Sequence, residues 1–170
     1  MGDWQTVVGL EIHVELATRS KLFCGCSTAF GAPPNTQCCE VCTGQPGSLP
    51  AVNKAAIDAA VRTALALGCT VQEWSRFDRK NYFYPDLPKA YQISQLYAPL
   101  AVGGGVALPS GAFIRIHELH VEEDAGKLLH TAQGTLVDYN RCGVPLIEIV
   151  TEPDFSNAGE VEAFVGLLRQ

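Results

Sequence analysis

Apolar and polar residues alternate along residues 7–16, whose sequence is VVGLEIHVEL. Alternation with a period of two over this length predicts a β-strand with one face on a core. The core face is aliphatic at every second position from Leu10 to Leu16. The other face carries Glu11, His13 and Glu15, so two carboxylates and an imidazole are expected to stand in a row.

A second stretch, residues 114–124, alternates in the same way and carries more charge. Its polar face is expected to present four side chains: Glu118, His120, Glu122 and Asp124. Glu123 points to the opposite face. Residues 135–140 and 145–150 are also predicted as strands, and the second of them alternates around Glu148.

Two stretches have the spacing of amphipathic helices, and the first of them is expected to pack on the sheet. Residues 53–67 begin at Asn53, a good N-cap, and end before Gly68, the residue type expected just past a helix. The second helix follows Asn157, with Glu160 placed as in a capping box. Its apolar pattern is still running at the last residue, which predicts that the sequence belongs to a longer protein.

The composition is that of a folded domain with an acidic surface. The chain has 170 residues, 47% of them hydrophobic, a net charge of −6 and a pI of about 5.1. This length is enough for one domain with a core. The charge argues against a broad basic surface for nucleic acid, and no apolar run approaches the ~20 residues of a membrane span.

The cysteines gather in residues 19–50, a Gly- and Pro-rich stretch predicted to be an ordered loop. Two closely spaced pairs, Cys24 with Cys26 and Cys39 with Cys42, can arrange four thiolates around one tetrahedral zinc ion. Cys38 competes with Cys39, which keeps the C-x-x-C spacing with Cys42. The alternative is a set of free buried cysteines. The odd total of seven cysteines and the lack of an export signal favour a reducing, cytoplasmic location.

Residues 75–95, SRFDRKNYFYPDLPKAYQISQ, interleave cations with aromatic residues and prolines. Such a stretch can stack bases and pair phosphates, or it can be a proline-stiffened loop with core aromatics and solvated lysines. Farther along, Lys127 follows a glycine turn, from which a lysine can reach a phosphate; a solvated turn lysine is the simpler alternative.

The two acidic strands suggest a cation site. Carboxylate oxygens bind hard divalent cations, and imidazole suits many metal ions. Two Glu- and His-rich strands would repel each other at close range without a cation between them. The alternative is an ordinary solvated sheet face.

Taken together, these stretches resemble the B subunit of the Asp/Glu-tRNA amidotransferases, the GatB/GatE family. The resemblance runs through nearly the whole chain. Its matching runs are VGLEIHVEL, KLFCGCSTAFGAPPNTQC, PGSLPAVNKAAIDAAV, FDRKNYFYPDLPKAYQISQ, HVEEDAGK and DYNRCGVPLIEIVTEPD. The fourth run is long and unusual enough to be close to diagnostic.

The resemblance implies an α+β fold: an antiparallel-sheet cradle domain with flanking helices, likened to glutamine synthetase, and a cysteine-rich zinc loop. Residues 1–170 would be the N-terminal cradle, incomplete at its C-terminal end and without the family's helical tRNA-binding domains. The implied activity uses ATP to phosphorylate the side-chain carboxylate of Glu-tRNA(Gln) or Asp-tRNA(Asn). Ammonia from an amidase-family glutaminase subunit then displaces phosphate, in a complex that also contains a small C subunit.

The resemblance also implies roles for particular residues. Catalytic roles fall to Glu11, His13 and Lys127, and phosphate or cofactor binding falls to Lys80, Lys89 and Lys127. The Mg²⁺ ligands would be Glu11, His13, Glu122 and Glu123, although strand alternation lets only one of the last two face the site unless the strand bulges. The structural Zn²⁺ ligands would be Cys24, Cys26, Cys39 and Cys42.

Two other functions compete with this one. A zinc-clipped adaptor module would bind tRNA or a partner subunit without catalysis, and the net charge of −6 counts against it. A stand-alone metal-dependent ligase or kinase would act on a small substrate, and the unfinished last helix counts against that.

Overall fold

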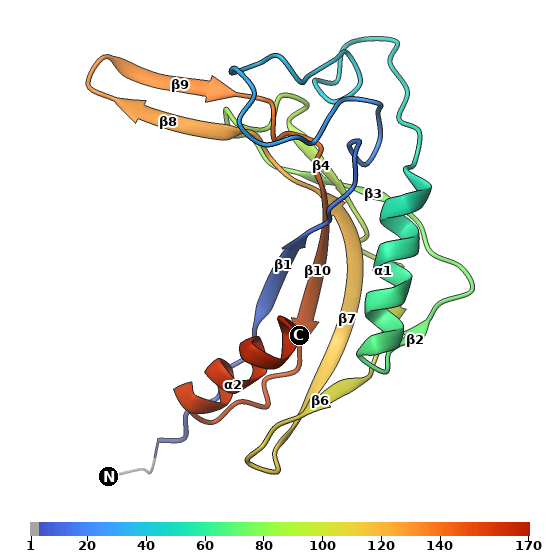
Figure 1. Ribbon diagram of the computed structural model, residues 1–170, viewed down its shortest axis with the longest axis vertical. Coiled ribbons are helices and arrows are strands. Elements are labelled where there is room, and N and C mark those ends of the chain that lie inside the picture. Colours follow the sequence, from blue (N-terminus) through green and yellow to red (C-terminus); the bar gives the residue numbers. More distant parts are fainter. Residues whose placement is uncertain (1–3) are drawn as a thin grey trace.

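The computed structural model, which describes residues 4–170, is organised around one long curved strand, β7 (Phe113–Glu123) (Figure 1). β10 (Pro145–Thr151) pairs with one edge of β7, and β1 (Glu11–Glu15) pairs with the far edge of β10. β5 (Ala101–Val102) and β6 (Gly105–Ala107) pair with the other edge of β7, and β2 (Thr70–Val71) extends the sheet beyond β5. Every pairing is antiparallel, which confirms the expected α+β class with an antiparallel sheet.

A β-bulge in β7 sets which side chains reach the core. Val150 pairs with Glu118, but the next residue, Thr151, pairs with Ile116, so one extra residue lies on β7. Without that residue, Ile116 would share a face with Glu118, His120 and Glu122. The bulge lets Ile116 and Leu119 both enter the core, and it leaves the polar residues after it together on the opposite face.

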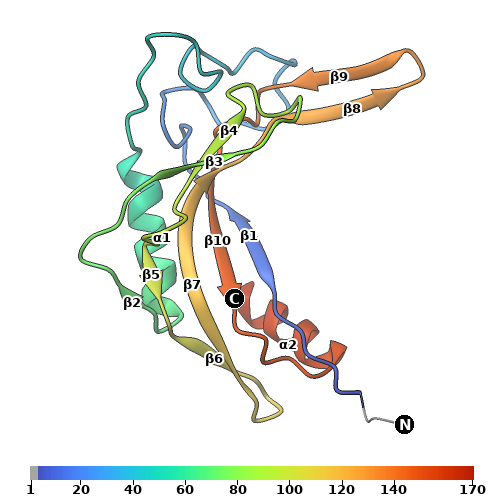
Figure 2. The ribbon, with the colours of Figure 1, turned by 180° about the vertical axis from the view of Figure 1, so that it is seen from behind.

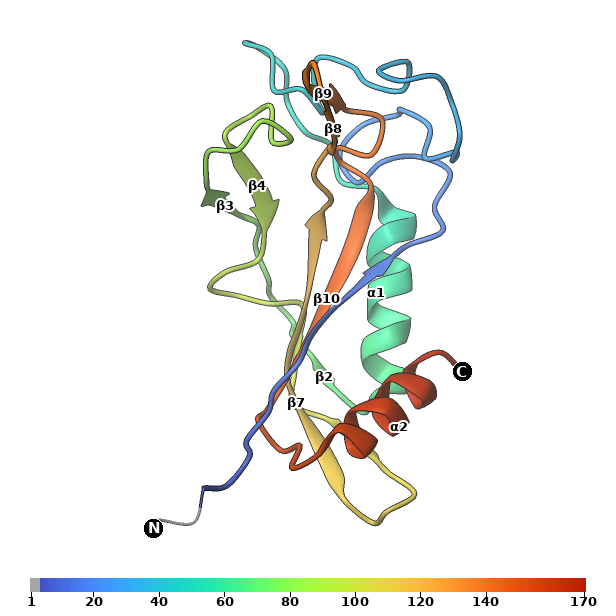
Figure 3. The same cartoon turned by 90° about the vertical axis from the view of Figure 1, so that its left-hand side faces the viewer.

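Both helices cover the apolar face of the sheet, as Figure 3 shows. α1 (Lys54–Ala66) buries Ala56, Ala60 and Ala64 against it. α2 (Ala158–Leu168) contributes Phe164, whose ring meets Phe155 edge to face. The predicted N-caps are confirmed: Asn53 accepts from the Ala55 N–H, and Asn157 accepts from the Glu160 N–H.

Two hairpins stand apart from the main sheet (Figure 2). β3 (Asp78–Asn81) and β4 (Tyr91–Ser94) lie across the face opposite the helices (Figure 3). β8 (Lys127–Thr131) and β9 (Gly134–Asp138) project from one end of the molecule. The alternative of a proline-stiffened loop over residues 75–95 therefore holds only for the middle of that stretch, because β3 and β4 occupy its two ends, and Lys127 begins a strand rather than lying in a turn. β3 and β8 are short and mostly exposed, so they lack the alternation that marks a half-buried strand. In β4 the buried positions are the polar Gln92 and Ser94, so its hydrophobic pattern does not mark it as a strand.

Beyond Leu119, β5 no longer pairs with β7, and side chains at the end of hairpin β3–β4 bond to the β7 backbone there instead. The Gln95 side-chain oxygen accepts from the Val121 N–H at 2.9 Å, and Gln92 Nε2 donates to the Glu123 carbonyl at 2.6 Å. Buried backbone groups need such partners. The two side chains thus give hydrogen-bond partners to the backbone of Val121 and Glu123, and they hold β4 beside Glu122.

Candidate metal sites

The row of acidic and imidazole side chains, hereafter the acidic site, comes from three strands. β10 lies between β1 and β7, the two strands that the sequence predicts as acidic. His13 on β1 pairs with Glu148 on β10, and Glu148 pairs with His120 on β7. Glu122 lies two residues along β7 on the same face. The result is a cross-strand cluster of imidazoles and carboxylates on the face away from the helices.

Three of these side chains converge closely enough to bind one ion. His13 Nε2 lies 3.1 Å from Glu122 Oε1 and 3.4 Å from Glu148 Oε2. One ligand atom from each residue lies within 4.8 Å of the other two. Neighbouring ligands of an octahedral Mg²⁺ are about 3 Å apart, given metal–oxygen distances near 2.1 Å. The donor set and its spacing therefore fit a small hard cation.

His120 supports this cluster from one side. Its Nε2 lies 3.0 Å from Glu148 Oε2, and its Nδ1 lies 3.1 Å from Glu118 Oε1. Burial alone would lower the pKa of His120, but hydrogen bonding and charge attraction from Glu122 and Glu148 raise it to about 9. In turn, the hydrogen bond from His120 lowers the pKa of Glu148 to about 2. Glu148 is therefore ionised at neutral pH and orientated by its neighbour, as an outer partner orientates a metal ligand.

The cluster is buried on one side and open on the other. The side chain of Glu122 is 2% exposed, whereas that of His13 is 53% exposed. Ser94 on β4 donates to Glu122 Oε2 at 3.1 Å, which fixes that carboxylate. Lys80 on β3 is near enough for its charge to contribute to the low pKa of Glu148. An ion held here would keep positions for water or a substrate on the His13 side.

The other residues predicted for this site lie elsewhere. Glu11 is exposed on β1, two residues from His13 on the same face, outside the group of three. Glu123 lies on the opposite face of β7, where Lys89 Nζ approaches its Oε1 to 2.6 Å. Lys127 is exposed at the start of β8.

Glu148 was missed as a ligand, although its sequence context held a signal. It is the one charged residue in PLIEIV, a run that is otherwise apolar. A charge inside a buried strand is costly unless it is paired or binds a metal ion. Strand order decides its partners, and strand order is a long-range property that alternation does not reveal.

Glu123 and Lys89 border a separate cavity of about 90 Å³. Both side chains are almost fully buried, and the Ile93 N–H also donates to Glu123 Oε1 at 2.9 Å. Burial raises the pKa of Glu123, and the charge of Lys89 opposes this rise. The cysteine-rich loop of residues 19–50 also lines this cavity, through Cys24, Cys42 and Gly44.

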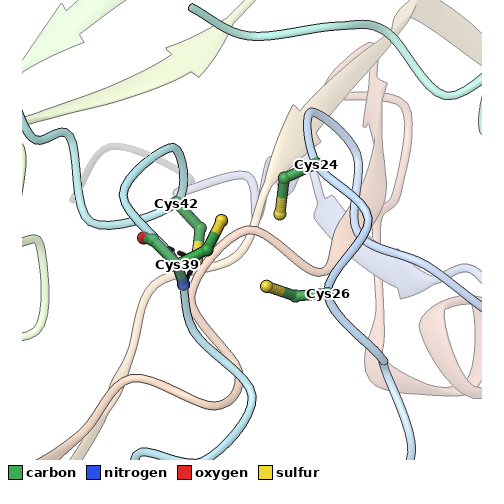
Figure 4. A group of neighbouring side chains, drawn as sticks. All are labelled: Cys24, Cys26, Cys39 and Cys42. Carbon is green, nitrogen blue, oxygen red and sulfur yellow. Dashed lines mark hydrogen bonds between the residues drawn. The ribbon is translucent and has the colours of Figure 1, made fainter. Parts of the chain in front are cut away.

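The four predicted zinc ligands come together as two pairs facing each other. Figure 4 shows the sulfur atoms of Cys24 and Cys26 directed towards those of Cys39 and Cys42. One sulfur from each residue lies within 4.8 Å of the others. Sulfur atoms around tetrahedral zinc are about 3.8 Å apart, given Zn–S distances near 2.3 Å. This group of four cysteines, hereafter the cysteine site, could therefore hold a metal ion such as zinc.

Electrostatics distinguish Cys42 within the cysteine site. Hydrogen bonding with Cys24 lowers the pKa of the Cys42 thiol, and the nearby charge of Lys21 acts in the same direction. The same pairing with Cys42 raises the pKa of Cys24. The Cys39 N–H donates to Cys42 Sγ at 3.2 Å. A thiolate at Cys42 is thus favoured by its surroundings, as metal binding requires.

The fold and these two clusters define an α+β domain with a carboxylate–imidazole group on the open face of its sheet and a four-cysteine loop at one end. The chain belongs to the GatB/GatE family, since the model of the GatB/GatE catalytic domain matches residues 6–170.

Curated relatives agree with this membership. The B subunit of the aspartyl/glutamyl-tRNA(Asn/Gln) amidotransferase from Agathobacter rectalis is 58% identical over 175 residues, which cover 100% of this chain and 37% of the relative. The protein of the same name from Ruminiclostridium cellulolyticum is 59% identical over 95% of this chain and 34% of its own length. That from Pseudothermotoga lettingae is 57% identical over 98% of this chain and 37% of its own length. The chain therefore spans little more than a third of these relatives.

Neither helix is long and apolar enough to cross a membrane within the part of the chain that the structure describes.

Proposed function

We propose that this chain is the carboxylate-activating part of the B subunit of a tRNA-dependent amidotransferase. The proposal is carried by the convergence of His13, Glu122 and Glu148, in a chain whose family and relatives bear that name. Residues 1–170 would then be the N-terminal cradle of a longer protein, similar in fold to glutamine synthetase.

The proposed reaction has two steps. The side-chain carboxylate of Glu-tRNA(Gln) or Asp-tRNA(Asn) attacks the γ-phosphorus of ATP, which gives an acyl phosphate and ADP. Ammonia then attacks the acyl carbon and phosphate leaves, so that Gln-tRNA(Gln) or Asn-tRNA(Asn) is formed. Ammonia would come from an amidase-family glutaminase subunit, with a small C subunit completing the complex. These partners and the cytoplasmic location of protein synthesis follow from the proposal.

The residues of the acidic site have distinct parts in this proposal. His13, Glu122 and Glu148 would hold Mg²⁺, which when bound neutralises phosphate charge and orientates the transferring group. Their closeness, and the ionised state of Glu148, support this choice. Glu11, on the same face of β1, would act at the open edge of the site. Lys80 would neutralise phosphate charge at this site, and Lys127, which lies outside the site at the start of β8, would contact phosphate from there.

Lys89 and Glu123 are proposed to line the path of ammonia or of the tRNA acceptor end rather than to bind the metal. Their mutual ion pair, away from the acidic face, favours that role over Mg²⁺ ligation by Glu123. The cysteine site is proposed to hold a structural Zn²⁺, because its loop has no helix or strand of its own to stabilise it.

The proposal is tested with Glu148→Gln in the full-length protein, assembled with its partner subunits. Because Gln keeps the shape but loses the charge, we expect tRNA-dependent release of phosphate from ATP to fall at least about 100-fold. Hydrolysis of glutamine by the partner should remain. Glu152→Gln, a change just past the end of β10 and outside the cluster, is the matched control. Unchanged phosphate release in Glu148→Gln would favour a non-catalytic adaptor module instead.

A further inference from the structure

Among the side chains of residues 4–170, Lys21 is the most deeply buried cation outside the proposed catalytic site. Its relative exposure is 0%, and it ranks among the largest fully buried side chains. Burying an ammonium group is costly unless an anion and hydrogen-bond acceptors compensate for the lost water.

Within residues 4–170 no Asp or Glu forms an ion pair with Lys21, although its charge contributes to the lowered pKa of Asp138 from beyond ion-pair distance. The nearby Glu123 is already paired with Lys89 at 2.6 Å. The two acceptors of Lys21 Nζ are the Tyr139 carbonyl at 3.3 Å and Cys42 Sγ at 3.6 Å. The group in direct contact with Lys21 that can carry a balancing negative charge is therefore a thiolate of the cysteine site.

Lys21 also joins the two halves of that site. Its backbone N–H donates to the Cys26 carbonyl at 3.0 Å, while its side chain reaches Cys42 on the other turn. The Cys42 sulfur then receives two N–H donors, from Lys21 and from the Cys39 backbone. Four thiolates around Zn²⁺ carry a net charge of −2, and outer donors of this kind stabilise such sites.

We propose that Lys21 is a positioning residue of the cysteine site, whose ammonium group offsets the negative charge of the metal–thiolate unit and holds the Cys42 sulfur. This inference rests on metal binding by the cysteines proposed above, and it is independent of the acidic site. It assigns a charge-compensating role to a lysine that has no part in the proposed phosphoryl transfer.

The first test measures zinc affinity by competition with a chromophoric chelator. Lys21→Met keeps the length and removes the charge, and we expect affinity to fall about 10–100-fold, as is usual for loss of an outer partner. Lys21→Arg should restore most of the affinity. Lys54→Met, on the exposed face of α1, should bind as the wild type does.

A spectroscopic signature separates positioning from a merely structural role. In the Co²⁺-loaded protein, loss of the N–H donor leaves more electron density on sulfur, so the sulfur-to-cobalt absorption of Lys21→Met should move to longer wavelength. A folded Lys21→Met protein with wild-type affinity and an unshifted band would overturn the proposal. A wild-type protein that binds neither zinc nor cobalt would instead overturn the cysteine site itself.

A measurement on the wild type decides the question if Lys21→Met does not fold. Amine acetylation followed by mass spectrometry should leave Lys21 unmodified in the zinc-loaded protein and modify it after zinc is removed. Lys54 should react in both states. Equal reactivity of Lys21 in the two states would contradict its contact with the metal-bound thiolate.

Discussion

Glu148 illustrates how one buried charge acquires its properties from its neighbours. It is 6% exposed, yet its pKa lies near 2 because His120 donates to it. His120 is itself held by Glu118 on its other ring nitrogen. The chain thus keeps an ionised carboxylate inside a largely apolar strand, which is the state that a cation ligand requires.

A second carboxylate with a low pKa, Asp154, gives a prediction about acid stability. Asp154 accepts two hydrogen bonds from the Arg115 guanidinium, at 2.8 and 2.7 Å, and these hold its pKa at about 2, below the ordinary 3.8. Since the folded-state pKa is depressed, the pair stabilises the fold fully above about pH 4. That contribution is lost as the pH falls through 2.

Asp154→Asn should therefore lower the free energy of unfolding by about 1 kcal/mol at pH 7, a modest value because Arg115 is exposed. The difference from the wild type should shrink towards pH 2. Urea unfolding between pH 2 and 7 measures both quantities. Asp58→Asn, in an exposed ion pair with Lys54, is the control and should change little. A pH-independent difference for Asp154→Asn would contradict the assigned pKa.

At the scale of elements, local signals predicted α1 and the three central strands well. Asn53 and the helical period fix α1 within a few residues, and alternation marks β1, β7 and β10. The short strands β3 and β8 were not predicted, because DRKN and KLLHT show no alternation. Local patterns also cannot predict that β10 lies between β1 and β7. The proposed role of Glu148 depends on that position, so it could not be predicted either.

The turn after Cys42 gives a prediction about how the cysteine loop packs on Lys89. Gly44 has a φ of +69°, and a Cβ at this position would overlap Lys89 Cγ. Gly44→Ala should therefore combine backbone strain with a clash and lower the free energy of unfolding by about 2–4 kcal/mol.

Gly47 offers a matched control in the same loop. Its φ is +84°, but a Cβ there would meet nothing within 4 Å, so Gly47→Ala should cost only the backbone strain, about 1–2 kcal/mol. Chemical denaturation of the two variants measures the difference. Equal losses in both would show that Lys89 does not pack against this turn.

At the scale of the whole molecule, the helices and the apolar face of the sheet form the core, while the candidate metal sites lie outside it. The loop that carries the cysteines has no helix or strand, and its stability should depend on the metal. Removal of zinc by a chelator should therefore lower the melting temperature by at least about 5 °C. Scanning calorimetry before and after chelation measures this, with re-addition of zinc as the control. An unchanged melting temperature in a protein that had contained zinc would contradict a structural role.

In the proposed acidic site, His13, Glu122 and Glu148, from three neighbouring strands, hold one divalent cation. The direct measurement is anomalous diffraction from crystals soaked in Mn²⁺, a heavier substitute for Mg²⁺. We expect one strong peak bounded by His13 Nε2 and the two carboxylates, present in Glu152→Gln crystals and lost in Glu148→Gln crystals. Density beside Glu123 and Lys89 instead, or no peak among the three residues, would contradict it.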